Sequence, residues 1–155
     1  MQAVCNEITV AEIKNGIHVI IKRQPCRVLN IIKQNTGKHG FAKANIIGIG
    51  VLDAKIYKTA LANHMYLPTF DLIQTDYQVI KIDGHKIEFT NNITSGEMII
   101  PNPTIDIIKD MATAFNEGKS IIITVIKAPV ERTPNNYIYR EAIISFRCDD
   151  KKIIP

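Results

Sequence analysis

Residues 35–43 read Asn35-Thr36-Gly37-Lys38-His39-Gly40-Phe41-Ala42-Lys43, and apolar, β-branched runs stand on both sides of them. Glycine adopts positive φ without steric cost, so Gly37 and Gly40 allow the backbone to turn tightly. The pattern predicts a β-hairpin that presents Lys38 at an exposed tip. Taken alone, it is typical of an ordinary turn with a solvated lysine. A phosphate-binding loop is excluded, because the first glycine and the Ser or Thr of that motif are missing.

Four segments in and around this loop form a longer recognisable pattern. In chain order they are residues 14–16 (KNG), 22–28 (KRQPCRV), 36–43 (TGKHGFAK) and 45–49 (NIIGI). Their order and spacing resemble the hypusine-containing translation factor 5A family of eukaryotes and archaea. The resemblance covers about residues 12–83 and thins toward the C-terminus.

The first half of the chain has the pattern of a small β-barrel. Short β-branched segments alternate with Gly, Pro or polar turns. We expect strands at residues 17–21, 27–33, 42–51 and 55–59. The pattern breaks around residues 67–71, and we place the domain boundary between about Gln74 and Ile82.

The second half predicts strands on either side of one helix. A hairpin is expected at residues 77–82 and 85–89, and later strands at 120–127 and 137–146. Asn102 suits the helix N-cap, Pro103 the first helical position, and Gly118 the stop. The apolar face of this helix comprises Ile105, Ile108, Met111, Ala112 and Phe115. With three strands before the helix and two after it, the second half is consistent with a five-stranded oligonucleotide-binding (OB) barrel.

The resemblance implies the same pair of folds. We therefore expect a mainly β protein, with an N-terminal SH3-like barrel followed by a C-terminal OB-fold barrel that carries one α-helix. The predicted domains are residues 1–78, basic and bearing the hairpin loop, and residues 79–155, the OB-fold domain.

Charge is concentrated in the first half. Residues 1–76 contain nine Lys or Arg against five Asp or Glu, whereas residues 77–155 contain ten of each, so the net charge of +4 belongs to the first half. An uncompensated basic surface attracts phosphate backbones, and RNA is the natural partner. Lys22, Arg27 and Lys33 are candidate phosphate contacts, although solvated surface cations fit the same pattern.

Several other classes of function lack support in the sequence. Cys5, Cys26 and Cys148 are odd in number and lack C-x-x-C spacing, so we expect buried free thiols rather than disulfides or a zinc site. The four histidines lack paired ligand spacing, and we assign no metal. No hydrolase or transferase motif is recognisable. The chain has neither a membrane-spanning apolar run nor a secretory signal, so we expect a cytoplasmic protein without membrane contact.

The resemblance also implies what the loop does. Lys38 would be the residue that deoxyhypusine synthase and deoxyhypusine hydroxylase convert to hypusine, with spermidine as the source of the added group. The remaining loop residues would support modification and tRNA contact: Thr36, Gly37, His39, Gly40, Phe41 and Lys43. The chain would be a substrate of those enzymes, not an enzyme, and would bind no cofactor of its own.

The same resemblance implies the partners. The family acts at the ribosomal exit site, where the modified lysine approaches the acceptor end of the peptidyl-tRNA. It relieves stalling, notably at proline runs, and aids termination. The sequence leaves open whether two copies form a homodimer.

The sequence departs from the family pattern at several positions, two of them in or near the basic segments. Phe41 replaces the usual histidine of the loop, and Arg23 replaces the usual glycine before the Pro-Cys pair. The main alternative is a hypusine-independent RNA- or ribosome-binding module. Such folds commonly use aromatic stacking platforms. Most aromatic residues of the second half alternate with apolar positions as core residues would: Tyr77, Phe89, Tyr137, Tyr139 and Phe146.

Overall fold

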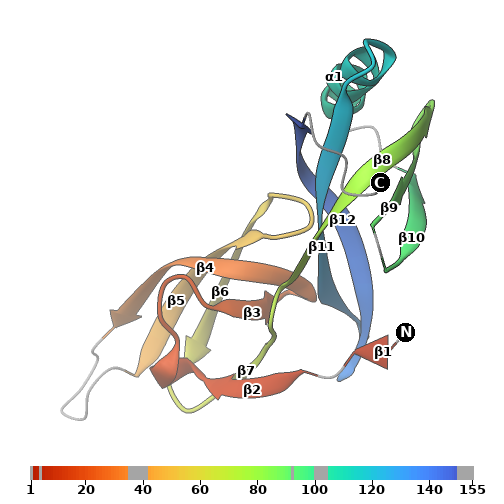
Figure 1. The fold of residues 1–155 in the computed structure, drawn as a ribbon. Helices are drawn as coiled ribbons and strands as arrows, with labels where there is room; N and C mark the ends of the chain where they lie inside the picture. The colour runs from red at the N-terminus through yellow and green to blue at the C-terminus, as the bar shows by residue number, and fades with distance from the viewer. Residues whose placement is uncertain (1, 4, 35–41, 92, 100–104, 150–155) are drawn as a thin grey trace. The chain divides into compact units, whose positions relative to one another are not determined.

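The computed structural model describes residues 2–3, 5–34, 42–91, 93–99 and 105–149, which form two compact units (Figure 1). Unit 1 comprises residues 1–73 and 127–140, and unit 2 comprises residues 74–126 and 141–155. Strands account for most of the described residues of both units, so the mainly β prediction is confirmed.

Unit 1 is built on one antiparallel sheet, the predicted SH3-like barrel. Its strands follow the order β2 (Asn6–Thr9), β7 (Tyr66–Thr69), β3 (His18–Ile21), β4 (Gln24–Gln34), β5 (Lys43–Gly50) and β6 (Ile56–Ala62). A short 3-10 helix, η1 (Val10–Glu12), follows β2. The four strands expected in the first half are present as β3 to β6. Strands β2 and β7 were not expected, because β2 has a single apolar residue, Ile8, and Pro68 interrupts the apolar pattern of β7.

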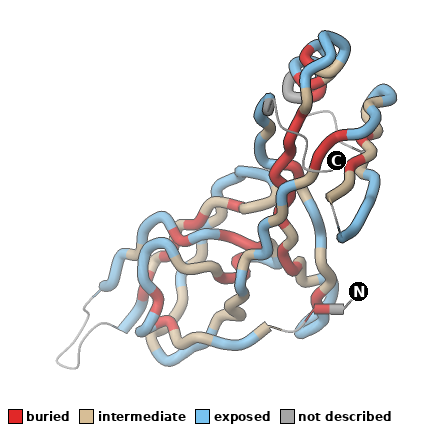
Figure 2. The backbone as a smooth tube through the Cα atoms, in the orientation of Figure 1, coloured by how far each residue is buried: buried red, intermediate tan, exposed pale blue. Residues whose placement is uncertain are grey.

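The core of unit 1 lies against the inner side of this sheet (Figure 2). Val19, Ile21, Val28 and Ile46 are fully buried there. Gly48 fills a position where a Cβ atom would lie 2.9 Å from Cδ1 of Ile21 and 3.0 Å from Cβ of Cys26. Glycine at residue 48 therefore allows β5 to approach its neighbours closely.

Unit 2 has the strand and helix order of the predicted OB barrel. The elements are β8 (Ile73–Asp83), β9 (Lys86–Thr90), β10 (Ser95–Ile99), α1 (Ile105–Asn116), β11 (Ser120–Thr133) and β12 (Asn136–Asp149). Helix α1 buries Ile108, Met111 and Ala114 in a core with Ile87 and Ile121. The predicted N-terminal residues of the helix, Asn102 and Pro103, lie outside the described residues.

Helix α1 ends as the sequence predicts. Gly118 has a φ of +83°, and the N–H of Lys119 donates to the carbonyl of Ala114 at 3.2 Å. Glycine adopts this left-handed conformation readily, which makes it a common helix terminator. Among the described residues, no helix is both long and apolar enough to span a membrane.

Strands β11 and β12 contribute residues to both units, and the end of their hairpin, residues 127–140, belongs to unit 1. The short strand β1 (Gln2–Ala3) pairs there with β12, with Ala3 opposite Tyr137. A small apolar cluster forms around these residues and Ile20 of β3. Strand β11 extends beyond its expected end, residue 127, to Thr133, and this outer part contains the buried Ala128 within unit 1. Strand β12 extends from its expected end, residue 146, to Asp149 within unit 2.

The three cysteines are free thiols with different exposure. Cys26 is buried, and burial raises the pKa of its thiol to about 12. Cys5 is half-buried, whereas Cys148 is exposed on β12. The expectation of buried thiols is thus confirmed for Cys26 and wrong for Cys148, which occupies a solvent-facing position of its strand.

The turn between β3 and β4 is strained at two consecutive residues. Lys22 has a φ of +50° and Arg23 a φ of +73°. A two-residue hairpin turn of this kind requires positive φ at both central residues, which is why glycine is favoured there. For residues with a Cβ atom this conformation costs about 1–2 kcal/mol each. The position of Arg23 is the one at which the related family usually has glycine.

We predict that Arg23→Gly raises the free energy of unfolding by about 0.5–1 kcal/mol, because glycine relieves the strain of positive φ. Arg23→Ala is the matched control, since it removes the same side chain but keeps a Cβ atom. Urea unfolding of the two variants measures the difference. Equal stability of Arg23→Gly and Arg23→Ala would contradict this account of the turn.

Candidate nucleic-acid interface

The hairpin that carries the lysine loop is closed by backbone pairing. Gln34 at the end of β4 lies opposite Lys43 at the start of β5. The N–H of Ala42 donates to the carbonyl of Gln34 at 3.0 Å, and the N–H of Asn63 donates to the carbonyl of Ala42 at 3.1 Å. These hydrogen bonds fix the two ends between which the loop sequence is inserted.

Most predicted loop residues lie outside the described residues. They are Thr36, Gly37, Lys38, His39, Gly40 and Phe41. Lys43 is described and exposed. The described part of the candidate interface consists of the strands that lead into and out of the loop.

Strands β4, β5 and β6 present one solvent-facing surface, which we term the outer face. Strand pairing aligns its residues in rows across the sheet, and side chains that share a row share a face. The rows are Arg27–Ile49–Ile56, Asn30–Ile47–Lys58, Ile32–Asn45–Ala60 and Gln34–Lys43–Ala62.

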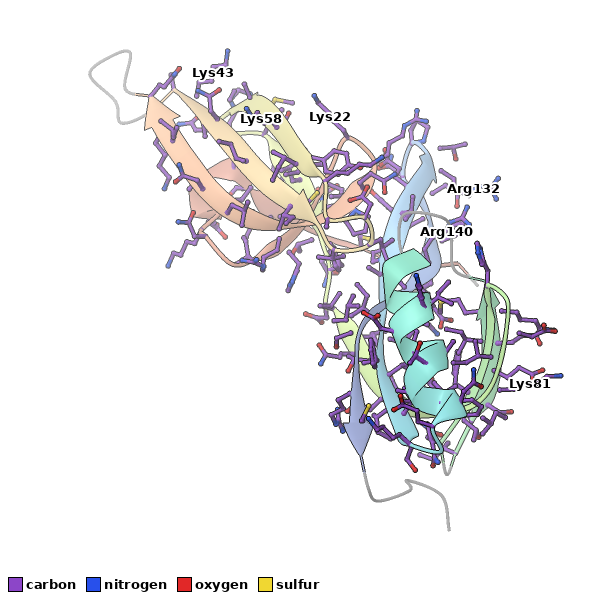
Figure 3. All side chains as sticks on the ribbon, turned by 90° about the horizontal axis from the view of Figure 1, so that it is seen from above. Lys22, Lys43, Lys58, Lys81, Arg132 and Arg140 are labelled. Carbon is purple, nitrogen blue, oxygen red and sulfur yellow. The ribbon has the colours of Figure 1, made fainter. Side chains whose placement is uncertain are left out.

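The outer face combines cationic, amide and apolar side chains and contains no carboxylate. Lys43 and Lys58 stand on neighbouring strands of it (Figure 3). Ile32 and Ile56 are 48% and 52% exposed. A groove is lined by residues of β5 and β6, of which Asn45, Ile47, Lys58 and Ala60 belong to the outer face and Ile46 and Thr59 do not. Cations with amide donors and apolar contact area suit the binding of an RNA backbone and its sugars.

The three candidate phosphate contacts, Lys22, Arg27 and Lys33, do not lie on one surface of unit 1. Arg27 lies on the outer face with Lys43, at the opposite end of β4. Lys33 pairs with the buried Ala44, so it stands on the other side of the sheet, and its Nζ donates to the carbonyl of Ala11 at 3.5 Å. Lys22 occupies the strained β3–β4 turn.

Sequence reasoning missed Lys58. The candidate phosphate contacts named from the sequence all lie between Glu12 and Asp53, a stretch without acidic residues, and Lys58 lies beyond it. Residues 55–59 were expected to form a strand, but only the pairing of β6 with β5 places Lys58 beside Ile47 and near Asn30. The alternation of Lys58 with the half-buried Tyr57 and Thr59 was the signal available in the sequence.

The two units differ in charge more than the two halves of the sequence do. Unit 1 contains twelve Lys or Arg and five Asp or Glu, a net charge of +7, whereas unit 2 contains seven and ten, a net charge of −3. Lys127, Arg132 and Arg140 cause most of the change, because residues 127–140 belong to unit 1. An electropositive unit of this kind attracts polyanions.

Unit 2 lacks the features of a nucleic-acid surface among its described strands. The solvent-facing positions of β8 to β10 mix Lys81 and Lys86 with Asp83, Glu88 and Glu97, and Lys86 is paired with Glu97 at 3.1 Å. The aromatic residues of unit 2 pack against its core: Tyr77, Phe89, Phe115 and Phe146. Tyr77 and Phe89 contact each other with ring centroids 4.7 Å apart. Tyr137 and Tyr139 belong to the apolar cluster of unit 1.

The described residues offer no metal centre. No group of three or more His, Cys, Asp or Glu side chains converges within the described ranges.

His18 reports on the electrostatics of unit 1. It lies opposite Arg27 in the β3–β4 pair, and the centroids of the His18 and Phe70 rings are 5.4 Å apart. Burial lowers the pKa of His18 below 6.5, repulsion by Arg27 lowers it further, and Asp71 opposes the shift. His18 is thus neutral in the folded protein at neutral pH.

We predict that Arg27→Gln moves the pKa of His18 upward, toward 6.5, because it removes a nearby positive charge. NMR titration of the imidazole measures this value, and Arg140→Gln, another exposed arginine of unit 1, serves as the control. In the wild type the unfolded chain binds the His18 proton more readily than the folded one, so stability is lost as pH falls through 6.5. A His18 pKa that is the same in both variants would exclude the influence of Arg27.

Comparison with known proteins places the chain in a family. Residues 5–64 match the Translation initiation factor 5A-like, N-terminal family. The chain is 30% identical to eukaryotic translation initiation factor 5A-1 of Schizosaccharomyces pombe over 124 residues, which is 77% of this chain and 76% of that protein. It is also 30% identical to the 5A-1 factor of Arabidopsis thaliana over 125 residues, with 79% and 78% covered.

Solved structures agree with these relatives. A translation initiation factor 5A family protein from Naegleria fowleri superposes with a TM-score of 0.78 at 25% identity, covering 94% of this chain and 99% of that one. The corresponding factor from Methanococcus jannaschii gives a TM-score of 0.61 at 20% identity, covering 93% and 98%, and supports the fold. The chain belongs to the translation initiation factor 5A family.

Proposed function

We propose that this chain is a translation elongation factor that binds the ribosome at the exit site and uses hypusine-modified Lys38 to stabilise the acceptor end of the peptidyl-tRNA. The observation that carries the proposal is the position of the Gly-Lys-His-Gly sequence between two paired strands of a family member. The proposed site of action is the cytoplasm.

The proposed modification explains why a lysine is needed in the loop. Deoxyhypusine synthase would transfer the aminobutyl group of spermidine to the ε-amine of Lys38, which breaks a C–N bond of spermidine and releases 1,3-diaminopropane, and deoxyhypusine hydroxylase would then add the hydroxyl group that completes hypusine. The amine must lose its proton before it can form a new C–N bond, and a desolvating pocket of another protein favours that loss. The nicotinamide cofactor and the iron of this chemistry belong to those enzymes.

The proposed contribution to peptide-bond formation is positional. Modification extends the side chain to roughly twice its reach and adds an amine and a hydroxyl at a narrow tip. Such a tip orders the end of the tRNA and restores a reactive geometry that proline disfavours, which lowers an entropic barrier. The same ordering would relieve stalling at proline runs and aid termination.

The outer face supports this proposal because it leads directly into the loop. Lys43 stands where β5 leaves the loop, and Lys58 and Arg27 extend the positive charge along the neighbouring strands. None of the ion pairs among the described residues involves these three side chains. They are available to bind RNA phosphates, which would orient the loop toward the tRNA.

The alternative, a hypusine-independent RNA- or ribosome-binding module, is supported by the net charge of unit 1. Its second component would be the OB barrel of unit 2. The described strands β9 and β10 present mixed charge and no exposed aromatic residue, so they do not favour nucleic-acid stacking. We therefore favour the function that depends on Lys38.

We predict that peptide mass spectrometry of the protein from its own cells finds a 4-amino-2-hydroxybutyl addition on Lys38. Phe41 replaces the usual histidine of the loop, so the modified fraction measures whether the synthase accepts this substitution. The peptide that contains Lys33 serves as an internal control and should be unmodified. Unmodified Lys38 throughout would favour the hypusine-independent module.

We predict that Lys38→Arg abolishes the rescue of proline-run translation in a reconstituted system that contains both modifying enzymes, because arginine keeps the charge but cannot be converted to hypusine. Lys43→Arg is the matched control, since it makes the same change at the exposed base of the loop. Peptide-bond formation on a proline-run message measures the effect. Normal rescue by Lys38→Arg would refute the proposed mechanism.

A further inference from the structure

Asn45 is an amide side chain in the middle of the outer face. It lies on β5, which is paired on both sides, opposite Ile32 of β4 and Ala60 of β6. Its neighbours on the same face of its own strand are Lys43 and Ile47, because side chains alternate along a strand. The registers of the two strand pairs therefore place Asn45 inside the outer face, with residues of that face on every side.

The amide of Asn45 is an unfavourable group for this position. Asparagine is depleted from β-strands, and the side chain is half-buried. Within the described ranges, it has no hydrogen-bond partner. A partly desolvated amide without a partner costs free energy that an apolar side chain would not cost. Residues that break a local rule in this way are expected at functional sites, so the amide is explained if an external group hydrogen-bonds to it.

The groove between β5 and β6 makes the amide accessible. It has a volume of about 320 Å³, and Asn45 lines it together with Ile47, Lys58 and Ala60 of the outer face. The side chain of Ala60 is small, and Ile32 on the other side of Asn45 is 48% exposed. An amide between apolar side chains suits an unstacked base, whose face needs apolar contact and whose edge needs hydrogen bonds.

The charges around the amide favour a nucleic acid as its ligand. The row of Asn45 lies between the row that contains Lys43 and the row that contains Lys58 (Figure 3). These rows contain no carboxylate, and unit 1 has a net charge of +7. A cation thus lies on each side of the amide, which matches the two phosphates that flank a nucleotide.

We infer that the Asn45 amide hydrogen-bonds to the edge of one unpaired adenine in a single-stranded RNA that lies on the outer face. The NH2 group of the amide would donate to N7 of adenine, and the amide oxygen would accept from the N6 amino group. Ile32 and Ile47 would contact the base. The inference rests on the proposed binding of RNA to the outer face and adds a base preference, which phosphate contacts alone do not give.

The experiment measures binding of the unmodified protein to short fluorescent oligouridines by anisotropy. The oligonucleotides contain no other base, or one central adenosine, guanosine or cytidine. Asn45→Leu removes the donor and the acceptor and keeps a side chain of similar size. Asn30→Leu is the matched control, since it makes the same change on the outer face at a residue that does not line the groove. Thermal unfolding verifies that both variants fold.

The wild type and Asn30→Leu should bind the adenosine-containing RNA about fivefold or more tightly than plain oligouridine, whereas Asn45→Leu should bind the two equally. Equal binding of all RNAs by the wild type, a stronger preference for guanosine or cytidine, or a preference retained by Asn45→Leu would overturn the inference.

A further variant separates this inference from the proposed function. Lys43→Gln with Lys58→Gln should weaken the binding of every oligonucleotide alike, because phosphate contacts do not depend on the base. Salt-dependent binding without a base preference would overturn the role of Asn45 and leave the proposed phosphate contacts standing. Failure of the wild type to bind any of the RNAs would overturn both.

Discussion

The pairing of β4 with β5 is the interaction on which the candidate interface depends. It closes the hairpin beneath the lysine loop, and its register decides which side chains share the outer face. A β-bulge between Val28 and Asn30 shifts this register by one residue. Because side chains alternate along a strand, such a shift moves every later residue to the opposite face. Asn30, Ile32 and Gln34 therefore join Arg27 on the outer face.

The same bulge explains why Lys33, one of the candidate phosphate contacts, does not lie on the outer face. Arg27 and Lys33 are six residues apart, and strict alternation would put them on one face. The bulge sends Lys33 to the other side, where it lies opposite Ala44 and reaches the carbonyl of Ala11. Short β-branched runs separated by Gly, Pro or polar turns predicted strands β3 to β6 in the first half. The bulge left no such signal, since polar and apolar residues are mixed in residues 28–34.

The second feature that the sequence did not predict is the contribution of the long β11–β12 hairpin to unit 1. Its strands were predicted as part of the second half, where most of their neighbours in sequence lie. Pairing of Ala3 with Tyr137 and burial of Ile20 beside them assign residues 127–140 to unit 1. These contacts join residues more than a hundred positions apart, and local patterns carry no information about such pairing. Composition nevertheless indicated the basic character of the first half correctly.

Assignment of residues 127–140 to unit 1 also changes how charge bears on function. The halves of the sequence differ by a net charge of +4 against 0, whereas the units differ by +7 against −3. A negative unit is repelled by an RNA surface while a positive one is attracted, so the chain is biased to approach RNA through unit 1. This bias acts before any contact forms and requires no specific recognition of bases. It would favour encounters in which the unit that carries Lys38 meets the RNA first.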